Sequence, residues 1–327
     1  MNKINSEKAV ELIRTQRLDW SLAATNYEAL DRVKVKEIDL GKVHFKVQFN
    51  PARIVSSAAK VDPRSIAERK CFLCRENRPS EQSGISYGED YTILVNPFPI
   101  FPLHLTIPGN RHADQLIRPF FGDMLDLAKE LDQFTIFYNG PKCGASAPDH
   151  MHFQAGNKGF MPLEKEWRNA ASLIVRYGET EIWNFYDGMR TAFVLEGRTK
   201  AEILKSFTAI YDLLEVKADE PEPLMNKPEV KADEPEPLMN LLAGYENGKY
   251  TVLIFPRAKH RPACYSAEGE ANLLISPASV DMGGVFITPR EEDFNKITQE
   301  QLKSILSEVC LAPEKMNSIA DKLKNAL

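Results

Sequence analysis

The stretch GASAPDHMHFQAG (residues 144–156) places two histidines, His150 and His152, one residue apart, and a glutamine, Gln154, two residues further on. Alternate side chains of a β-strand point to the same face, so we expect these three polar side chains on one face of a strand and the intervening apolar residues on the other. A half-buried strand whose polar face meets water would account for one histidine. Two neighbouring imidazoles in a chain with only six histidines need a stronger reason, which the rest of the chain has to supply.

The sequence on either side of this stretch predicts an α+β fold. Alternation of apolar and polar residues predicts strands, and apolar residues at helical spacing predict helices. The strands expected in the first half lie at 43–49, twice within 91–108 and at 133–140, with a helix between 118 and 134. Those expected in the second half lie at 191–197 and 249–257, with helices at 200–215 and at the C-terminal end. The short connections favour two halves, each an antiparallel sheet packed with helices.

The boundary between the two predicted domains is drawn at residue 190, which gives an N-terminal domain of residues 1–190 and a C-terminal domain of residues 191–327. The second domain contains an exact repeat, EVKADEPEPLMN, at 215–226 and again at 229–240. Acidic residues and prolines dominate both copies, so we expect a solvated loop over 215–240 and assign it no chemistry.

Composition excludes several classes of function. The chain has 327 residues, of which 43% are hydrophobic, and can bury a core without disulfides. A net charge of −5 and the lack of a Lys/Arg block argue against nucleic acid as a partner. The sequence contains no apolar run long enough for a signal or membrane-spanning segment, so we expect a cytoplasmic protein with no membrane partner.

A metal site is indicated by Cys71 and Cys74, the pair in CFLC. Their surroundings are polar and loop-like, which favours zinc over a thioredoxin-type dithiol. Tetrahedral zinc needs two more ligands, and histidine nitrogen completes such sites. We favour His112, in the turn after HLTIP, over His104, which opens that predicted strand. One member of the H-x-H pair supplies the fourth ligand, which leaves the other imidazole free on the same face.

A free imidazole suits nucleophilic attack on phosphorus, because it is neutral near pH 7 and covalent catalysis divides one displacement into two easier steps. The preceding loop, NGPKCGAS, contains Gly140 and Gly144, so its backbone N–H groups and the Ser146 hydroxyl can approach phosphate oxygens. Gln154 can donate a hydrogen bond to a non-bridging oxygen. We expect Cys143 to pack within the loop rather than to react.

Two basic groups lie outside this stretch. Arg53 is a candidate for neutralising a phosphate, with an ordinary surface arginine as the alternative. Arg257 begins the cluster RAKHR, residues 257–261, which is either a second phosphate or acceptor site or a solvated turn.

Together, CFLC, NPFPIFPLHLTIPGNRH and YNGPKCGASAPDHMHFQ resemble the histidine triad superfamily. The similarity is to the branch of galactose-1-phosphate uridylyltransferases, diadenosine tetraphosphate phosphorylases and GDP-hexose phosphorylases, whose motif ends in glutamine, as at Gln154. It covers residues 40–160 well and the second half in outline. Asp149 directly before His150 is similar to the phosphorylases, because the uridylyltransferases have proline at this position.

The resemblance implies two histidine-triad-like halves and an enzyme that moves a nucleoside monophosphate through a nucleotidyl-histidine intermediate. His152 matches the nucleophile. The other matched positions are the zinc ligands Cys71, Cys74, His112 and His150, the phosphate-side residues Asn139 and Ser146, and Asn96 near the ribose. The donor implied is a nucleotide sugar or dinucleoside polyphosphate, and the acceptor is phosphate or a sugar phosphate. Iron is the alternative metal, and a homodimer is the expected assembly.

Two rival functions are weighed against nucleotidyl transfer. The first is a nucleotide hydrolase of the histidine triad type, which Gln154 disfavours because an amide cannot act as a general acid or base. The second is a non-catalytic, zinc-stabilised nucleotide-binding protein, whose sign would be the loss of His152 or Gln154, and both are present.

Overall fold

A computed structural model describes residues 4–54, 61–215 and 236–327 of the chain. Its helices are α1 (Ser6–Asp19), α2 (Ser21–Leu30), α4 (Pro63–Glu68), α5 (Phe121–Glu130), α6 (Leu163–Glu166), α7 (Lys200–Leu214), α8 (Ser279–Met282), α9 (Glu291–Lys296), α10 (Gln299–Val309) and α11 (Pro313–Ala326). Its strands are β1 (Lys34–Asp39), β2 (His44–Phe49), β3 (Gly84–Tyr87), β4 (Tyr91–Val95), β5 (His104–Pro108), β6 (Phe134–Asn139), β7 (His152–Asn157), β8 (Ala171–Tyr177), β9 (Thr180–Tyr186), β10 (Thr191–Gly197), β11 (Met239–Glu246), β12 (Lys249–Pro256) and β13 (Val285–Thr288).

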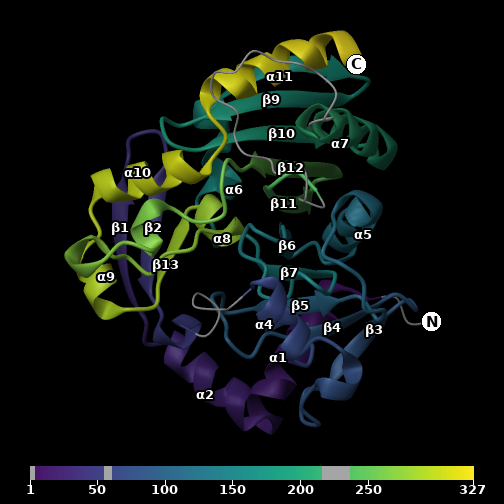
Figure 1. Cartoon of the computed structure of the whole chain (residues 1–327). Helices are drawn as coiled ribbons and strands as arrows, with labels where there is room; N and C mark the ends of the chain where they lie inside the picture. The colour runs from purple at the N-terminus through teal and green to yellow at the C-terminus, as the bar shows by residue number, and fades with distance from the viewer. Residues whose placement is uncertain (1–3, 55–60, 216–235) are drawn as a thin grey trace.

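The α+β class is confirmed, and two sheets are present. The larger is a ten-stranded antiparallel sheet in the order β3-β4-β5-β7-β6-β11-β12-β10-β9-β8, and the smaller contains β1, β2 and β13 (Figure 1). The two halves of the chain are joined edge to edge in the large sheet, because β6 pairs with β11 through four residue pairs from Ile136–Ala243 to Asn139–Asn240.

Strand order repeats between the two halves. Read from the outer edges inwards, β3-β4-β5-β7-β6 corresponds to β8-β9-β10-β12-β11, and a helix follows the third strand of each set, α5 in the first half and α7 in the second. This repetition assigns β8 and β9 to the second half. The boundary predicted at 190/191 falls between β9 and β10 and so separates β8 and β9 from the rest of the second half. It was drawn there because neither strand was predicted from the sequence.

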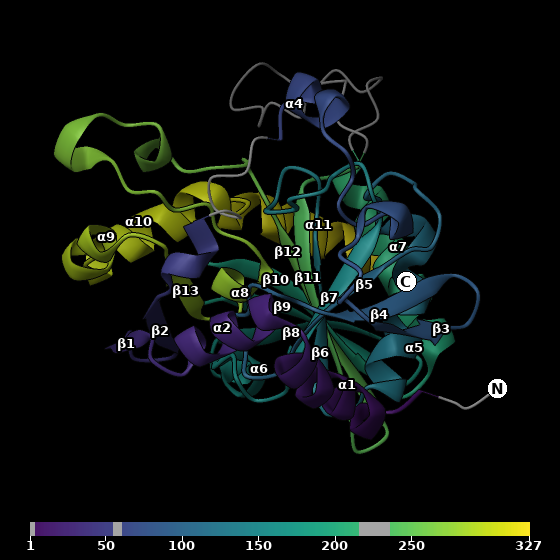
Figure 2. The same ribbon diagram turned by 90° about the horizontal axis from the view of Figure 1, so that it is seen from below.

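Helices and the small sheet cover opposite faces of the large sheet. Apolar side chains of α1, α5, α7 and α11 pack on one face. The other face packs against β2, β13, α8 and α10. Figure 2 shows these two layers on either side of the strands. Within the small sheet β13 runs parallel to β2, an exception to the antiparallel arrangement expected throughout.

The loop expected over 215–240 lies largely outside the described residues, which resume at 236. Its last residues are not a solvated loop, because Met239 and Asn240 begin β11 and Glu236 is buried. The expectation is wrong here because a short apolar start to a strand is hidden inside an acidic, proline-rich repeat.

Candidate functional site

A compact cluster of sulfur and nitrogen atoms lies beside the start of β7. Cys71, Cys74, His112 and His150 each offer one ligand atom, and these atoms all lie within 4.8 Å of one another. The Nδ1 atom of His150 is 3.3 Å from Sγ of Cys71, and Nδ1 of His112 is 3.2 Å from Sγ of Cys74. His104 is not in the cluster. The structure therefore brings together the four residues predicted as metal ligands.

The hydrogen bonds of His150 leave its Nδ1 atom free for a metal. Its Nε2 atom lies 2.8 Å from the carbonyl oxygen of Gly109, which can only accept, so Nε2 carries the proton. Beside the cluster, Asp149 pairs with Arg69 and lies 3.9 Å from Nε2 of His112. A histidine that binds a metal through one ring nitrogen usually donates the N–H of its other ring nitrogen to a carbonyl or carboxylate oxygen.

The two thiols titrate very differently in the absence of a cation. Burial opposes ionisation of Cys71, but its hydrogen bond with His150 and those from two backbone amides lower its pKa to about 6. Burial and the neighbouring Cys71 raise the pKa of Cys74 to about 11. Two thiolates this close repel each other, and a divalent cation between them would remove that repulsion.

His152 is the first residue of β7 and is only 5% exposed. Its Nδ1 atom is 2.8 Å from the carbonyl oxygen of His150, so Nδ1 carries the proton and the lone pair lies on Nε2. Burial lowers the pKa of this imidazole to about 4, against a smaller opposing effect of the bond to His150. His152 is therefore neutral near pH 7, with Nε2 as the nucleophilic atom.

This protonation state gives the first prediction. In ¹⁵N-histidine NMR spectra, His152 should appear as the neutral Nδ1–H tautomer and should titrate near pH 4. Unfolded histidine binds a proton below about pH 6.5, so this group makes the folded state less stable as the pH falls from 6.5 to 4, by up to about 1.4 kcal/mol per pH unit. A midpoint near 6.5, or an Nε2–H tautomer, would contradict the geometry.

His150 does not share a strand face with His152 as predicted, because it precedes β7. The chain turns there, and this turn directs one imidazole to the cysteines and leaves the other on the sheet. Met151 and Phe153 are both buried in the core on the helical side of the sheet, as expected for the apolar face.

Gln154 is held by His104. The Nδ1 atom of His104 accepts from the N–H of Ile100, so its Nε2 atom donates to the side-chain oxygen of Gln154, 3.1 Å away. Asn96 lies 3.4 Å from the same oxygen and also donates to Thr106. Within the described residues the amide nitrogen of Gln154 has no hydrogen-bond partner, so its donors remain available.

The loop between β6 and β7 is fixed by close backbone contacts. Gly144 has a φ of +97°, and a Cβ there would lie 2.4 Å from Cβ of Ala278, so only glycine fits. Ser146, two residues on, is partly exposed. The side-chain oxygen of Asn139 accepts from the N–H of Ser279 and from the amide of Asn240, so this part of Asn139 supports the loop.

Asn240 was not predicted as a site residue, but it also donates to the carbonyl oxygen of Cys143 at 2.7 Å. No sequence pattern marks this asparagine, because its partners lie about a hundred residues away in the chain.

Arg257 has a different position from the exposed strand end that we expected. Its guanidinium is 4% exposed and donates to Asn240 and to the backbone carbonyls of Val309, Pro277, Lys259 and His260. All three guanidinium nitrogens are thus engaged within the protein, which makes Arg257 a support beneath Asn240 and leaves its predicted ligand contact without geometric support.

Arg53 and part of the 257–261 cluster lie near other residues of the predicted site. Arg53 donates to the carbonyl oxygen of Phe98 at 2.8 Å, and its charge contributes, after burial, to lowering the pKa of His104 to about 3. Burial and then the charges of Arg261, Arg257 and Lys142 lower the pKa of His260 to about 4. Because Lys142 belongs to the β6–β7 loop, part of the 257–261 cluster lies near that loop.

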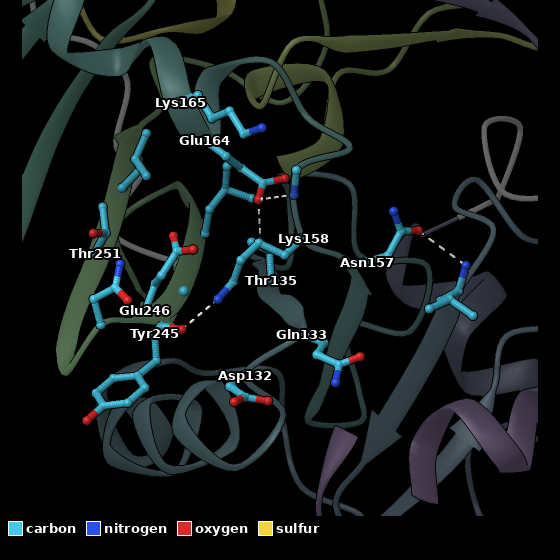
Figure 3. A pocket seen from close by; sticks show the side chains of 16 residues that line it. Asp132, Gln133, Thr135, Asn157, Lys158, Glu164, Lys165, Tyr245, Glu246 and Thr251 are labelled. Atoms are coloured by element: carbon cyan, nitrogen blue, oxygen red, sulfur yellow. Dashed lines mark hydrogen bonds between the residues drawn. The ribbon is translucent and has the colours of Figure 1, made fainter. Parts of the chain in front are cut away.

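A cavity of about 740 Å³ opens at the other end of β7 (Figure 3). Its lining includes Asn157, the last residue of β7, together with Lys158 and Glu164. Glu164 accepts from Thr135 and from the N–H groups of Gly159 and Met161, so it braces the wall of the cavity. His152 and Asn157 are five residues apart on one strand, or roughly 16 Å, so the cavity is separate from the histidine site.

Two family models match the chain. Residues 12–157 match the Domain of unknown function (DUF4922), and residues 239–327 match the GDPGP1-like, C-terminal domain. No protein with a curated description is similar enough in sequence to count as a relative.

Solved structures match over nearly the whole chain. Crystal structures of yeast Ap4A phosphorylase Apa2 are similar with a TM-score of 0.60 at 17% identity, over 92% of this chain and 97% of that one. The complex with AMP gives a TM-score of 0.59 at 16% identity over 94% and 97%, and the complex with Ap4A gives 0.55 at 15% over 91% and 97%. The chain therefore has the fold of yeast Ap4A phosphorylase, and its residues 239–327 are similar to the GDPGP1-like C-terminal domain.

Proposed function

We propose that this protein is a nucleotidyltransferase of the phosphorylase type, which moves a nucleoside monophosphate to phosphate or a sugar phosphate through His152. The observation that carries the proposal is the fixed tautomer of His152, whose Nδ1–H is bonded to the carbonyl of His150 and whose Nε2 lone pair is free. Support also comes from the shared fold, since the yeast enzyme of that fold is an Ap4A phosphorylase crystallised with AMP and with Ap4A.

The proposed reaction has two displacements. In the first, Nε2 of His152 attacks the α-phosphorus, a P–N bond forms, and the bond from phosphorus to the leaving oxygen breaks with both electrons remaining on that oxygen. In the second, an oxygen of the acceptor attacks the same phosphorus and the P–N bond breaks, which restores the neutral imidazole. Because His152 is already neutral, no base is needed to generate the nucleophile.

The surrounding groups have proposed roles in both steps. The free amide donors of Gln154 stabilise charge on the non-bridging oxygens, an effect worth a few kcal/mol per donor in known enzymes. Ser146 and the backbone around Gly144 contact the phosphate chain, and Arg53 neutralises it. Asn139 and Asn96 act mainly as supports, through their bonds to Asn240 and Gln154. Lys142 with the 257–261 cluster is the proposed acceptor side.

Zinc is the metal that we propose for Cys71, Cys74, His112 and His150, because two cysteines and two histidines are a common tetrahedral zinc set. All four ligand atoms lie within 4.8 Å of one another, and three of the sulfur–nitrogen distances are 3.2, 3.3 and 3.6 Å. Iron is the alternative ion. Bound zinc would fix His150, whose carbonyl holds the proton of His152, so its role is to stabilise and orient.

Assembly and location are also proposals. No helix within 4–54, 61–215 or 236–327 has the length and apolar character needed to cross a bilayer. We propose a cytoplasmic homodimer, on the resemblance to the family.

The test is a substrate panel with a phosphate requirement. Ap4A, GDP-hexoses and UDP-hexoses are each incubated with the zinc-loaded protein, with and without phosphate. We expect one class to yield a nucleoside diphosphate only when phosphate is present. Release of nucleoside monophosphate without phosphate would indicate the hydrolase instead. Binding without any turnover, whether phosphate or a hexose 1-phosphate is supplied as acceptor, would indicate the non-catalytic protein.

A further inference from the structure

Strands β6 and β7 separate at the point where the proposed nucleophile lies. Their antiparallel pairing runs from Phe134–Asn157 to Phe137–Gln154. Continued by two residues, the same register would pair Asn139 directly with His152. That pair is absent from the ladder of the described strands, and the side chain of Gln115 takes its place.

The amide of Gln115 bonds to both strands. Its nitrogen donates to the carbonyl oxygen of Asn139 and to that of His152, each at 3.0 Å. Its oxygen accepts from the N–H of His152 at 2.8 Å. Only one orientation of the amide satisfies all three bonds, because two of the partners accept and the third donates. The side chain thus takes the place of one residue pair of the β-ladder, and it keeps the two strands apart at this point.

Gln115 is itself held in place by hydrogen bonds to its own backbone. Its N–H donates to the carbonyl oxygen of Pro148 at 3.1 Å, and its carbonyl oxygen accepts from the hydroxyl of Tyr138 at 3.1 Å. Tyr138 also bonds to Glu236, whose other oxygen accepts from the N–H of Ile117 at 2.8 Å. Gln115 is completely buried, and both atoms of its amide are used.

We propose that Gln115 is the positioning residue for His152. Its side chain accepts a hydrogen bond from the main-chain N–H of His152 and donates one to the main-chain carbonyl oxygen of His152. The carbonyl oxygen of His150 accepts the hydrogen bond of the His152 imidazole. These contacts fix the direction of Nε2. Gln115 contacts no substrate, and its effect on turnover rests on the proposed function.

Removing this amide has a defined consequence. In Gln115→Met, which has similar length and shape, three buried backbone groups lose their partner, and β6 can close onto β7 by forming the missing Asn139–His152 pair. Either outcome moves the His152 ring. A displacement of about 1 Å costs up to roughly 100-fold in rate, so we expect kcat to fall by about 10- to 100-fold with KM changed by less than about threefold.

The experiment compares Gln115→Met with Ile210→Ala, a core variant in α7 that loses stability and whose apolar side chain makes none of these hydrogen bonds. The two measurements are kcat and KM, and the NMR signal of the His152 Nδ1–H proton in the zinc-loaded protein. Loss or broadening of that signal with lower kcat in Gln115→Met, but not in Ile210→Ala, supports the proposal. An unchanged signal with wild-type kcat overturns it.

Failure of the proposed function and failure of the variant to fold can each be distinguished from failure of the Gln115 proposal. If wild-type protein turns over no nucleotide, the proposed function fails, while the Nδ1–H signal still decides whether Gln115 positions His152. If Gln115→Met does not fold, Gln115→Glu replaces it. Buried against two carbonyl oxygens, Glu is protonated, so it accepts from the His152 N–H but donates to only one of the two carbonyls. A loss of kcat in the same direction is expected, and wild-type kcat with an unchanged signal again overturns the proposal.

Discussion

His152→Gly should lower turnover by at least about 1,000-fold, because the proposed reaction has no other route to its covalent intermediate. Metal content should not change, because the imidazole of His152 lies outside the Cys/His cluster. The fold should also persist, since Met151 and Phe153 still fill the core on the opposite face. Added imidazole should restore part of the activity by occupying the vacated space with the same nucleophile.

Turnover of the substrate found in the panel is the measurement, with His44→Gly as the control. His44, the first residue of β2 in the small sheet, is exposed and pairs with Glu166 of α6, so its loss should leave turnover near the wild-type value. Undiminished turnover in His152→Gly would remove the nucleophile from the proposed mechanism.

Cys74→Ser should lose most of the bound metal and several kcal/mol of stability, because formation of a structural zinc site contributes its binding free energy to folding. A hydroxyl is a poor replacement for a thiolate at zinc. Turnover should fall as well, since His150 would no longer be fixed and its carbonyl holds the proton of His152.

Metal analysis and thermal unfolding of purified protein test this expectation. Cys264→Ser is the matched control, because Cys264 is a free, partly buried cysteine outside the cluster. Full metal occupancy in Cys74→Ser would show that the four side chains are not the ligands, whatever ion the protein contains.

Local patterns were sufficient to predict many single elements of the fold. The alternation in 43–49 and in 91–108 predicts β2, β4 and β5, and helical spacing predicts α5 and α7. The joining of both halves into one sheet depends on pairing between β6 and β11, which are about a hundred residues apart in the chain. No local pattern carries that information. The edge strand β8 and its neighbour β9 were missed, because their apolar residues do not alternate as clearly.

The reactive and metal-binding residues of the candidate site could be predicted from the sequence, whereas the residues that support them could not. Cysteine spacing and the H-x-H pair indicated the cluster and the free imidazole, because metal ligands and nucleophiles are restricted to few residue types. The supports were not predictable, since Gln115, Asn240 and Arg257 act through hydrogen bonds to distant backbone atoms that any polar side chain could make. The exposed ligand role predicted for Arg257 illustrates this limit, because its sequence neighbours look like a surface turn.

The most direct test of nucleotidyl transfer is to isolate the intermediate. Wild-type protein is incubated with the active nucleotide labelled at the α-phosphorus, in the absence of acceptor, quenched in base, digested and analysed by mass spectrometry. We predict one nucleoside monophosphate attached to Nε2 of His152, stable in base, labile in acid and discharged by the acceptor. Label on a different residue, or no label with a nucleotide that the protein does turn over, would contradict the covalent mechanism.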